Sequence, residues 1–289
     1  MLIRSYYMLT KPGIILGNLI TTAGAFAFAA GKHFSLPLFL ATLAGLGLII
    51  ASACICNNYM DRHSDAKMAR TKHRPFVKGT VSTKAALALA LFLGLVGVVV
   101  LTLCTNPVTV VLSVIGFAFY VGMYTVLKHH LTSGTLIGSI AGAIPPVVGY
   151  CAVTHQIDLG AILLFTTLFL WQMPHFYSIA LFRLKEYEAA QIPIHPIRHG
   201  TRATKVHIVW YIIAFIGSLS LFTIFGLTGL VYLVVMLLVS SVWLAQALQG
   251  IWHGFWTESD ARWARKLFIC SLVVIMTFSG LIALSHFGV

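Results

Sequence analysis

Nine long apolar stretches, each able to cross a lipid bilayer as a helix, constrain this chain more than any other feature. They cover residues 14–30, 36–56, 85–104, 108–127, 134–153, 159–182, 206–226, 228–248 and 267–286. Only 9% of the 289 residues are charged, whereas a soluble domain carries about 25%, and the mean hydropathy is +0.93. We therefore predict an all-α integral membrane protein, in which nine transmembrane helices form one domain over residues 1–289.

The distribution of basic residues predicts how the chain is oriented in the membrane. If the N-terminus is cytoplasmic, all of the 19 Lys and Arg residues except Lys32 fall in segments on the inner side. This asymmetry explains the net charge of +12 without a nucleic-acid partner. The two long polar loops, about 57–84 and 183–205, would then be cytoplasmic, and the C-terminus would be periplasmic. These loops lie four helices apart, so we expect two four-helix halves plus a ninth helix, with both loops covering one cavity.

The first long polar loop begins with three oxygen-bearing side chains at helical spacing. Asn57, Asp61 and Asp65 lie four residues apart, which would place them along one face of a helix. Oxygen ligands of this kind suit a hard divalent cation such as Mg²⁺. Six basic residues follow: Arg62, Lys67, Arg70, Lys72, Arg74 and Lys78. A solvated basic loop is the simpler interpretation, but two carboxylates at a membrane edge require a partner. We therefore predict a site for a metal ion and a phosphorylated ligand.

The fourth and fifth apolar stretches carry two patterns that packing explains in part. Tyr120, Tyr124 and Lys128 share the four-residue spacing, and an interfacial aromatic belt accounts for the tyrosines alone. Lys128 would also suit an anion held above the cavity. Gly134, Gly138 and Gly142 are spaced by four, which indicates close helix packing. The Pro145-Pro146 pair that follows predicts a kink.

The sixth apolar stretch contains the cluster Trp171-Gln172-Met173-Pro174-His175-Phe176. Pro174 should bend the helix, and polar groups at this depth should face the protein interior. A hydrogen-bonded structural histidine is the alternative to a ligand-binding role for His175. Farther on, Arg183, Glu186 and Tyr187 share a face, although surface salt bridging explains that group equally well.

Together, five segments resemble the UbiA-type intramembrane prenyltransferases, and in particular the branch of that family that farnesylates protohaem IX. The segments are Thr10-Lys11-Pro12-Gly13, Asn57-Asn58-Tyr59-Met60-Asp61-Arg62, Arg70-Thr71-Lys72-His73-Arg74-Pro75, Gly142-x-x-Pro145-Pro146-x-x-Gly149-Tyr150 and Trp171-Gln172-Met173-Pro174-His175-Phe176. The resemblance extends from about residue 8 to the end of the chain.

This resemblance implies nine helices around a central cavity that opens to the cytoplasmic side of a bacterial inner membrane. It implies Mg²⁺-dependent transfer of the farnesyl group of farnesyl diphosphate to a vinyl group of haem B, with addition of water. The product, haem O, would be delivered to a haem–copper terminal oxidase. In one respect the chain departs from the wider family, whose members often carry a second D-x-x-x-D motif after the sixth helix. Arg183-Leu184-Lys185-Glu186-Tyr187-Glu188 stands there instead, and Glu186 is the only substitute ligand that we would name.

The resemblance also assigns roles to single residues. Mg²⁺ would be held by Asn57, Asp61 and Asp65, which thereby become the catalytic set. The diphosphate would be bound by Arg62, Lys72, Arg74 and Lys128. Haem would be oriented by His175, by axial contact or by a hydrogen bond, beside Gln172 and Trp171, with His73 as the alternative histidine.

Two other functions are consistent with parts of the sequence. A related enzyme could act on a quinone or a chlorophyll-type acceptor, although the segment 171–176 argues against it. A transporter for an anionic solute would explain the basic loops and the helix-breaking prolines. It would not explain the Asn57, Asp61 and Asp65 stack unless a cation bridged these residues to the anion.

Overall fold

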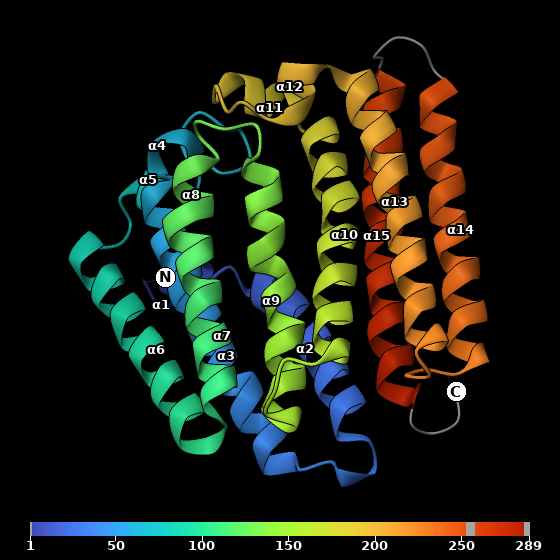
Figure 1. Cartoon of the computed structure of the whole chain (residues 1–289). Coiled ribbons are helices and arrows are strands. Elements are labelled where there is room, and N and C mark those ends of the chain that lie inside the picture. The colour runs from blue at the N-terminus through green and yellow to red at the C-terminus, as the bar shows by residue number, and fades with distance from the viewer. Residues whose placement is uncertain (1, 253–257, 286–289) are drawn as a thin grey trace.

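The computed structural model describes residues 2–252 and 258–285, and all regular structure in these ranges is helical. Nine helices in the described ranges are long and apolar enough to cross a membrane, which confirms the predicted number (Figure 1). Eight of them are α2 (Pro12–Ala30), α3 (Leu36–Met60), α6 (Thr83–Cys104), α9 (Gly134–Thr154), α10 (Leu159–Phe182), α13 (Thr201–Ile224), α14 (Leu230–Trp252) and α15 (Glu258–Leu284). The remaining span is composite and joins α7 (Pro107–Ala118), the π-helix η2 (Phe119–Tyr124) and α8 (Thr125–Leu127).

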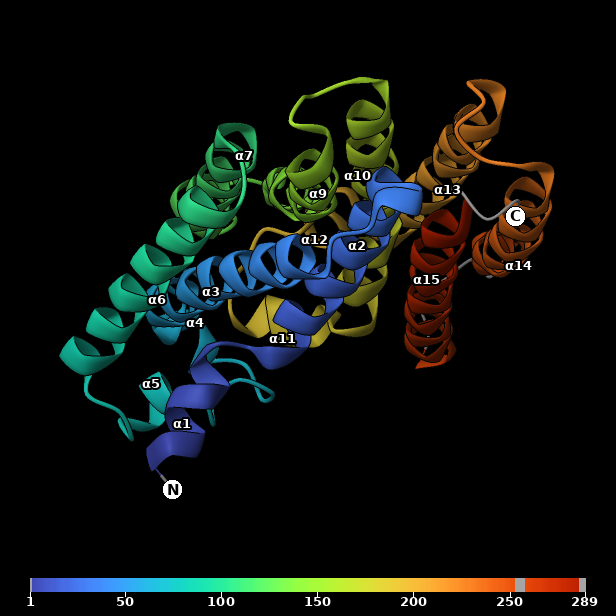
Figure 2. The same ribbon diagram turned by 90° about the horizontal axis from the view of Figure 1, so that it is seen from below.

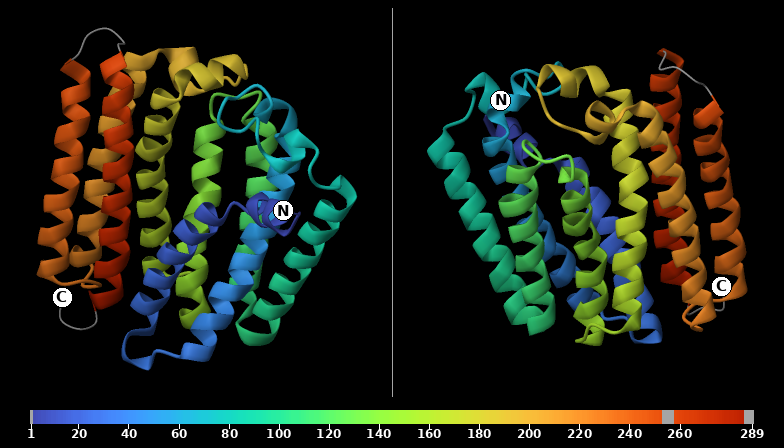
Figure 3. Two further views of the ribbon diagram at one scale, coloured as in Figure 1. Left: turned by 180° about the vertical axis from the view of Figure 1, so that it is seen from behind. Right: turned by 45° about the horizontal axis from the view of Figure 1, so that its top comes forward.

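Short helices interrupt the polar segments, which are too hydrophilic to lie within a bilayer. They are α1 (Leu2–Leu9), α4 (Arg62–Asp65), α5 (Pro75–Lys78), α11 (Leu184–Ala189) and α12 (His195–His199), with a 3₁₀ turn η1 (Gly31–His33). In Figure 1, α4, α11 and α12 lie at the same upper end of the bundle. With the top of the molecule turned forward, the right-hand view of Figure 3 shows the segments after α3 and after α10 closing over that end.

The helices differ in how far their neighbours cover them. In the most apolar 18-residue window of each span, 72% of the α9 residues are buried, but only 17% of those in α6. Seen from below, α2 and α3 lie along one side of the molecule, and α7, α9, α10 and α13 lie along the other (Figure 2). The exposed apolar faces of α6 and of the α7 span are therefore part of the surface available to lipid.

Glycines allow α2 to pack closely on its neighbours. A Cβ atom at Gly149 of α9 would lie 2.3 Å from the backbone oxygen of Thr22 on α2. A Cβ atom at Gly24 of α2 would lie 2.6 Å from the backbone oxygen of Ser279 on α15. Close backbone approach of this kind is typical of helix pairs in membranes. It fixes α2 between α9 and α15.

The predicted stripe of small residues on α9 is a packing surface, as expected. A Cβ atom at Gly134 would lie 2.7 Å from the Lys128 backbone, and one at Gly138 would lie 2.9 Å from the Tyr124 ring. Tyr124 lies in the wide turns of the π-helix η2, a type of irregularity that is frequent at functional sites.

At α13 and α15, a pair of charged residues accompanies a helix start earlier than predicted. The last helix begins at Glu258 rather than 267, and Asp260 in its first turns is 2% exposed. Lys205, near the start of α13, is 3% exposed and places its Nζ atom 2.5 Å from Asp260 Oδ1. Pairing offsets the cost of burying either charge alone, so both helices extend beyond their apolar stretches.

Candidate active site

Two adjoining chambers lie inside the helix bundle, and the polar segments contribute to the first of them. The first, which we call the polar chamber, has a volume of about 410 Å³. Its acidic and basic lining residues are Lys11, Asp61, Asp65, Arg70, Arg74, Lys128, His129 and Arg183. The second, which we call the apolar chamber, has a volume of about 570 Å³ and is lined mainly by aliphatic and aromatic residues. The chambers share the wall residues Ile14, Tyr120, Tyr124, Phe176, Ile179 and Phe268.

Both long polar loops contribute to the polar chamber, so the prediction that they cover one cavity is confirmed. The first loop provides the 61–74 part of the lining, and the second provides residues from Arg183 to Ile194. Tyr120, Tyr124 and Lys128 also line this chamber, which confirms that they share a face.

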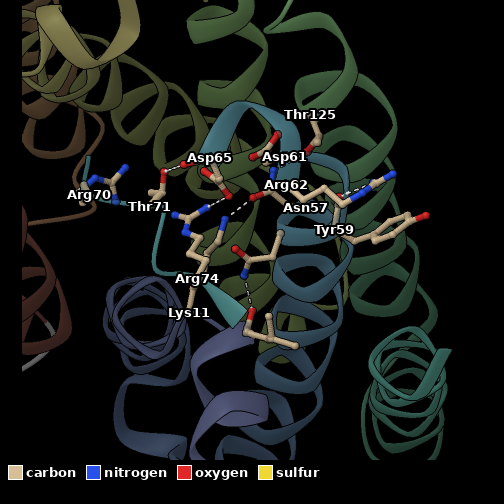
Figure 4. A network of polar contacts seen from close by, with 12 residues as sticks. Lys11, Asn57, Tyr59, Asp61, Arg62, Asp65, Arg70, Thr71, Arg74 and Thr125 are labelled. Carbon is tan, nitrogen blue, oxygen red and sulfur yellow. Dashed lines mark hydrogen bonds and ion pairs between the residues drawn. The ribbon is translucent and has the colours of Figure 1, made fainter. Parts of the chain in front are cut away.

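Asn57, Asp61 and Asp65 form one wall of the polar chamber, and their exposed fractions are 1%, 6% and 4%. Helical backbone bonds continue past the end of α3, from Asp61 N to Asn57 O at 2.9 Å and from Asp65 N to Asp61 O at 2.8 Å. The four-residue spacing therefore keeps the three side chains on one face, as predicted. Asn57 Nδ2 donates to Thr125 Oγ1 at 2.9 Å, which directs Oδ1 away from Thr125 (Figure 4).

Each member of this wall contacts a basic side chain. Lys11 Nζ donates to Asn57 Oδ1, and Lys128 Nζ donates to Asp61 Oδ2. His129 Nε2 lies 3.2 Å from Asp61 Oδ1. Arg74 NH1 lies 2.6 Å from Asp65 Oδ2. The charges of the two carboxylates are thus balanced within the chamber.

These contacts determine which groups are charged. Burial by itself would raise the pKa of Asp61, but the His129 hydrogen bond and the Lys128 charge outweigh it and lower this pKa to about 2. Burial and the nearby charge of Arg74 lower the pKa of Lys11 to about 8. At neutral pH the Asp61 carboxylate is therefore ionised.

The donor set fits a magnesium ion bound together with a phosphate group. Among the described residues, no group of three or more His, Cys, Asp or Glu side chains could hold a metal ion by itself. Mg²⁺ usually binds through one or two carboxylates, several waters and substrate phosphates. Asp61, Asp65 and the amide oxygen of Asn57 provide protein ligands of that kind on one wall.

In the second polar segment, Glu186 pairs with Arg183 and lies close to Arg70. Arg183 NH1 lies 2.9 Å from Glu186 Oε1, and Arg70 Nε lies 4.0 Å from Glu186 Oε2. Arg70, Arg183 and Tyr187 line the chamber, whereas Glu186 does not. Burial raises the pKa of Tyr187 to about 12, so its hydroxyl stays protonated. This half of the site therefore presents positive charge and a hydrogen-bond donor.

The predicted cluster on α10 lines the apolar chamber. His175 Nδ1 lies 2.7 Å from Ser271 Oγ on α15, and its ring stacks on that of Trp171 with a centroid distance of 4.6 Å. Trp171 Nε1 donates to the Ser271 backbone oxygen at 2.9 Å. Gln172 is 5% exposed and packs above Gly142, where a Cβ atom would lie 2.2 Å from its Oε1 atom. These polar groups thus face the protein interior, as predicted.

The family model of the UbiA prenyltransferase family matches residues 18–273. The chain belongs to that family. It is therefore a prenyltransferase, and its spans make it a multi-pass membrane protein.

The relatives of this UbiA prenyltransferase include two proteins named protoheme IX farnesyltransferase, from Edwardsiella ictaluri and Serratia proteamaculans. Each is 48% identical over 96% of this chain and 93% of its own length. Among solved structures, an apo UbiA homologue from Aeropyrum pernix K1 matches with a TM-score of 0.73 at 16% identity, covering 93% of this chain and 97% of its own. A UbiA homologue from Archaeoglobus fulgidus, bound to DMAPP and Mg²⁺, matches with a TM-score of 0.68 at 14% identity, covering 96% of this chain and 99% of its own. These structural matches confirm the predicted fold.

Besides Glu186, three residues predicted at the site line neither chamber. Arg62 lies 4.1 Å from the centroid of the Tyr59 ring and donates to the Tyr59 backbone oxygen at 2.8 Å, on the outer side of the helix (Figure 4). Lys72 and His73 are exposed and lie in a turn outside the lining. The turn between α4 and α5 directs Arg70 and Arg74 inward and these two residues outward.

The sequence interpretation assigned no role in the site to Lys11 or His129. Lys11 belongs to the segment Thr10-Lys11-Pro12-Gly13 and has left-handed backbone angles just before α2 (φ 52°, ψ 66°). This backbone conformation, which brings Lys11 to the site, cannot be recognised from the sequence. His129 directly follows the predicted Lys128 and contacts the same carboxylate, Asp61. Its role could therefore have been predicted more easily than that of Lys11.

Proposed function

We propose that this prenyltransferase transfers the farnesyl group of farnesyl diphosphate to a vinyl group of haem B, with addition of water. Haem O and diphosphate are the products. The observation that carries the proposal is the junction of the two chambers. A polar chamber with more basic than acidic lining residues adjoins a larger apolar chamber that contains a histidine, a tryptophan and a glutamine. The names of the relatives at 48% identity support haem as the acceptor.

The polar chamber would bind the diphosphate. Mg²⁺ held by Asn57, Asp61 and Asp65 would neutralise charge on the leaving group. Arg74 and Lys128 now contact the two carboxylates, and they would turn to the diphosphate oxygens when the metal takes their place. Lys11 would do the same from the Asn57 side. The metal and the displaced cations thus act together on the departing diphosphate.

The second polar segment would help to neutralise the charge of the diphosphate with arginines, without a second aspartate motif. Arg70 and Arg183 line the chamber, and Glu186 pairs with Arg183 at 2.9 Å and lies 4.0 Å from Arg70. Guanidinium groups bind phosphate oxygens in a bidentate manner. We propose that these arginines replace the second metal-binding motif of other family members, with Glu186 as their support.

The shared wall would protect the reacting carbon. When the C1–O bond of farnesyl diphosphate breaks, diphosphate takes the electron pair and an allylic cation remains. Tyr120, Tyr124 and Phe176 lie where the chambers meet, and aromatic rings stabilise a nearby cation. The π electrons of a haem vinyl group then form the new carbon–carbon bond. Water captures the resulting cation beside the porphyrin and loses a proton, which leaves a hydroxyl group.

In the apolar chamber, His175, Gln172 and Trp171 would orient the porphyrin, because they are polar or aromatic groups in an otherwise apolar lining. His73 is no longer needed for this role, because it is exposed and lies outside the chamber.

We further propose that the polar chamber opens to the cytoplasm from a bacterial inner membrane, and that haem O is delivered to a haem–copper terminal oxidase. The restriction of all basic residues but Lys32 to one side supports this orientation. A reporter fused after Lys78 or Lys205 should give a cytoplasmic signal, and one fused after Gln156 a periplasmic signal. A periplasmic signal after Lys205 would contradict the proposed orientation.

Mass spectrometry of haem extracted from expressing cells tests the reaction. Wild-type protein should produce a haem whose mass has increased by one farnesyl group plus one water. An Asp65→Ala variant expressed at the same level should produce none. Prenylation of a quinone in place of haem would overturn the proposed acceptor while leaving the prenyltransferase activity intact.

A further inference from the structure

Ser271 of α15 holds two members of the α10 cluster at once. Its side chain lies 2.7 Å from His175 Nδ1, and its backbone oxygen accepts the Trp171 Nε1 proton at 2.9 Å. Ser271 itself is fully buried. It lies outside the apolar chamber lining, whereas His175 lies within it. Ser271 therefore acts on the chamber only through the residues that it holds.

The hydrogen bonds of Ser271 determine where the proton of His175 lies. Ser271 Oγ is 2.6 Å from the backbone oxygen of Phe268, one turn earlier in α15. Two oxygen atoms at that distance require a proton between them, and only the Ser271 hydroxyl can provide it. The hydroxyl proton is thus committed to Phe268, so Ser271 Oγ must accept a proton from His175 Nδ1. In the neutral imidazole, Nε2 is therefore unprotonated and keeps its lone pair.

The surroundings of the imidazole leave that lone pair available to the chamber. The His175 ring packs against Trp171 at 4.6 Å and against Phe268 at 4.9 Å between centroids. Nδ1 is occupied by Ser271, and Nε2 makes no hydrogen bond within the described ranges 2–252 and 258–285. A metal-binding histidine characteristically donates its other ring N–H to a fixed acceptor, which orients the ring.

We propose that Ser271 is a positioning residue that holds His175 in the Nδ1–H form, so that Nε2 binds the iron of the porphyrin acceptor as an axial ligand. This inference rests on the proposed function, because it requires a haem in the apolar chamber. It selects axial ligation over a hydrogen bond from His175 to a haem substituent, since a bare Nε2 has no proton to donate. It also makes α15 part of the acceptor site, although α15 contributes no polar side chain to the lining.

A second histidine provides a matched control outside both chambers. His195 Nδ1 lies 2.8 Å from Thr204 Oγ1, and that hydroxyl donates to the Gly200 backbone oxygen at 2.9 Å. By the same argument, His195 also carries its proton on Nδ1. It is 9% exposed and lines neither chamber. If a bare Nε2 anywhere in the protein sufficed for haem binding, His195 would contribute as much as His175.

The test compares four variants with wild type in detergent, using haem titration followed by Soret absorption and by electron paramagnetic resonance of the ferric form. Ser271→Ala should weaken haem binding by about 10–100-fold and change the axial-ligand signature. Ser271→Thr keeps a hydroxyl and should restore the wild-type spectrum. His175→Gln should abolish the histidine-ligated signature. Thr204→Val, the control, should leave the spectrum and the haem affinity unchanged.

Binding of farnesyl diphosphate with Mg²⁺ is measured on each variant and should be the same in all four, which shows that the bundle is intact. A wild-type spectrum and haem affinity in either Ser271→Ala or His175→Gln would overturn the inference. If wild type farnesylates haem but either variant keeps its spectrum and affinity, the inference fails and the proposed function stands. If wild type neither binds nor farnesylates haem, both fail.

Discussion

The two chambers stabilise their polar groups in different ways. In the polar chamber, each carboxylate is paired with a basic side chain from another segment: Asp61 with Lys128 and Asp65 with Arg74. In the apolar chamber, His175 and Trp171 are fixed instead by neutral hydrogen bonds to a neighbouring helix. The first arrangement consists of long, flexible basic side chains that can exchange partners. The second consists of short contacts between packed helices that cannot rearrange easily.

This difference follows from what each chamber is proposed to bind. A buried carboxylate without a counter-charge is costly, so the wall needs cations whenever a metal is not bound. Those same cations are useful again when a diphosphate arrives. A flat apolar acceptor offers no comparable charge, so its orientation depends on rigid groups placed in advance. The polar chamber should therefore respond to metal, and the apolar chamber to packing.

The largest expected effect comes from removing the carboxylates of the polar chamber. Asp61→Ala and Asp65→Ala should each abolish detectable farnesyl transfer, a larger loss than the roughly 10–100-fold typical of a residue that only supports a ligand. Asn57→Ala should be milder, because a neutral ligand contributes less than a carboxylate. Rates are measured on protein whose fold is checked by size-exclusion chromatography. Glu188→Ala, an exposed acid outside the chamber, is the control. Near-normal turnover by Asp65→Ala would contradict the metal-ligand assignment.

The same comparison shows what the sequence reveals and what it does not. The nine spans were predictable because each is a continuous apolar stretch. The Asn57, Asp61 and Asp65 wall was predictable because helical backbone bonds extend beyond α3 and preserve the spacing. Arg62, Lys72 and His73, which we expected at the site, lie outside the linings of both chambers. Proximity to a motif in the sequence does not indicate which side of a turn a residue occupies.

Contacts between residues far apart in the chain could not be predicted from the sequence. His175 and Ser271 are 96 positions apart, and Ser271 lies in an ordinary apolar stretch with no distinguishing motif. Lys11 reaches Asn57 only because the backbone turns sharply before α2. Spacing identifies residues that share one helix face, whereas contacts between helices depend on packing that spacing does not encode.

An intermediate effect should come from removing a basic partner. Arg74→Met leaves Asp65 buried without its cation, which should destabilise the protein by up to about 3 kcal/mol and slow turnover. In the Arg74→Met variant, Mg²⁺ no longer competes with an arginine for the Asp65 carboxylate. In the absence of diphosphate, the Mg²⁺-dependent rise in thermal unfolding midpoint should therefore be larger for Arg74→Met than for wild type. Arg62→Met, which removes a basic side chain outside the chamber, should respond to Mg²⁺ as wild type does. Equal Mg²⁺ shifts in all three proteins would show that the Arg74 contact does not compete with metal.

The smallest expected effect tests packing in the apolar chamber, by comparing two glycines of α9. A Cβ atom at Gly142 would lie 2.2 Å from Gln172 Oε1, the end of a flexible side chain, whereas one at Gly149 would lie 2.3 Å from the Thr22 backbone oxygen. Gly149→Ala should therefore lose about 1–3 kcal/mol of stability, because the backbone of α2 must move. Gly142→Ala should lose little, since Gln172 can turn away and alanine favours a helix.

Gly142→Ala should nevertheless affect catalysis. Displacing the Gln172 amide should raise the KM for haem several-fold while leaving the KM for farnesyl diphosphate unchanged. Gln172→Ala should do the same, and the double variant should be no worse than either single one, because both changes remove one interaction. Gly217→Ala of α13, where a Cβ atom would meet nothing within 4 Å, is the control and should match wild type. Additive losses in the double variant would mean that Gly142 serves the chamber by some route other than Gln172. An equal rise in the KM for farnesyl diphosphate would mean that the two chambers do not separate the two substrates.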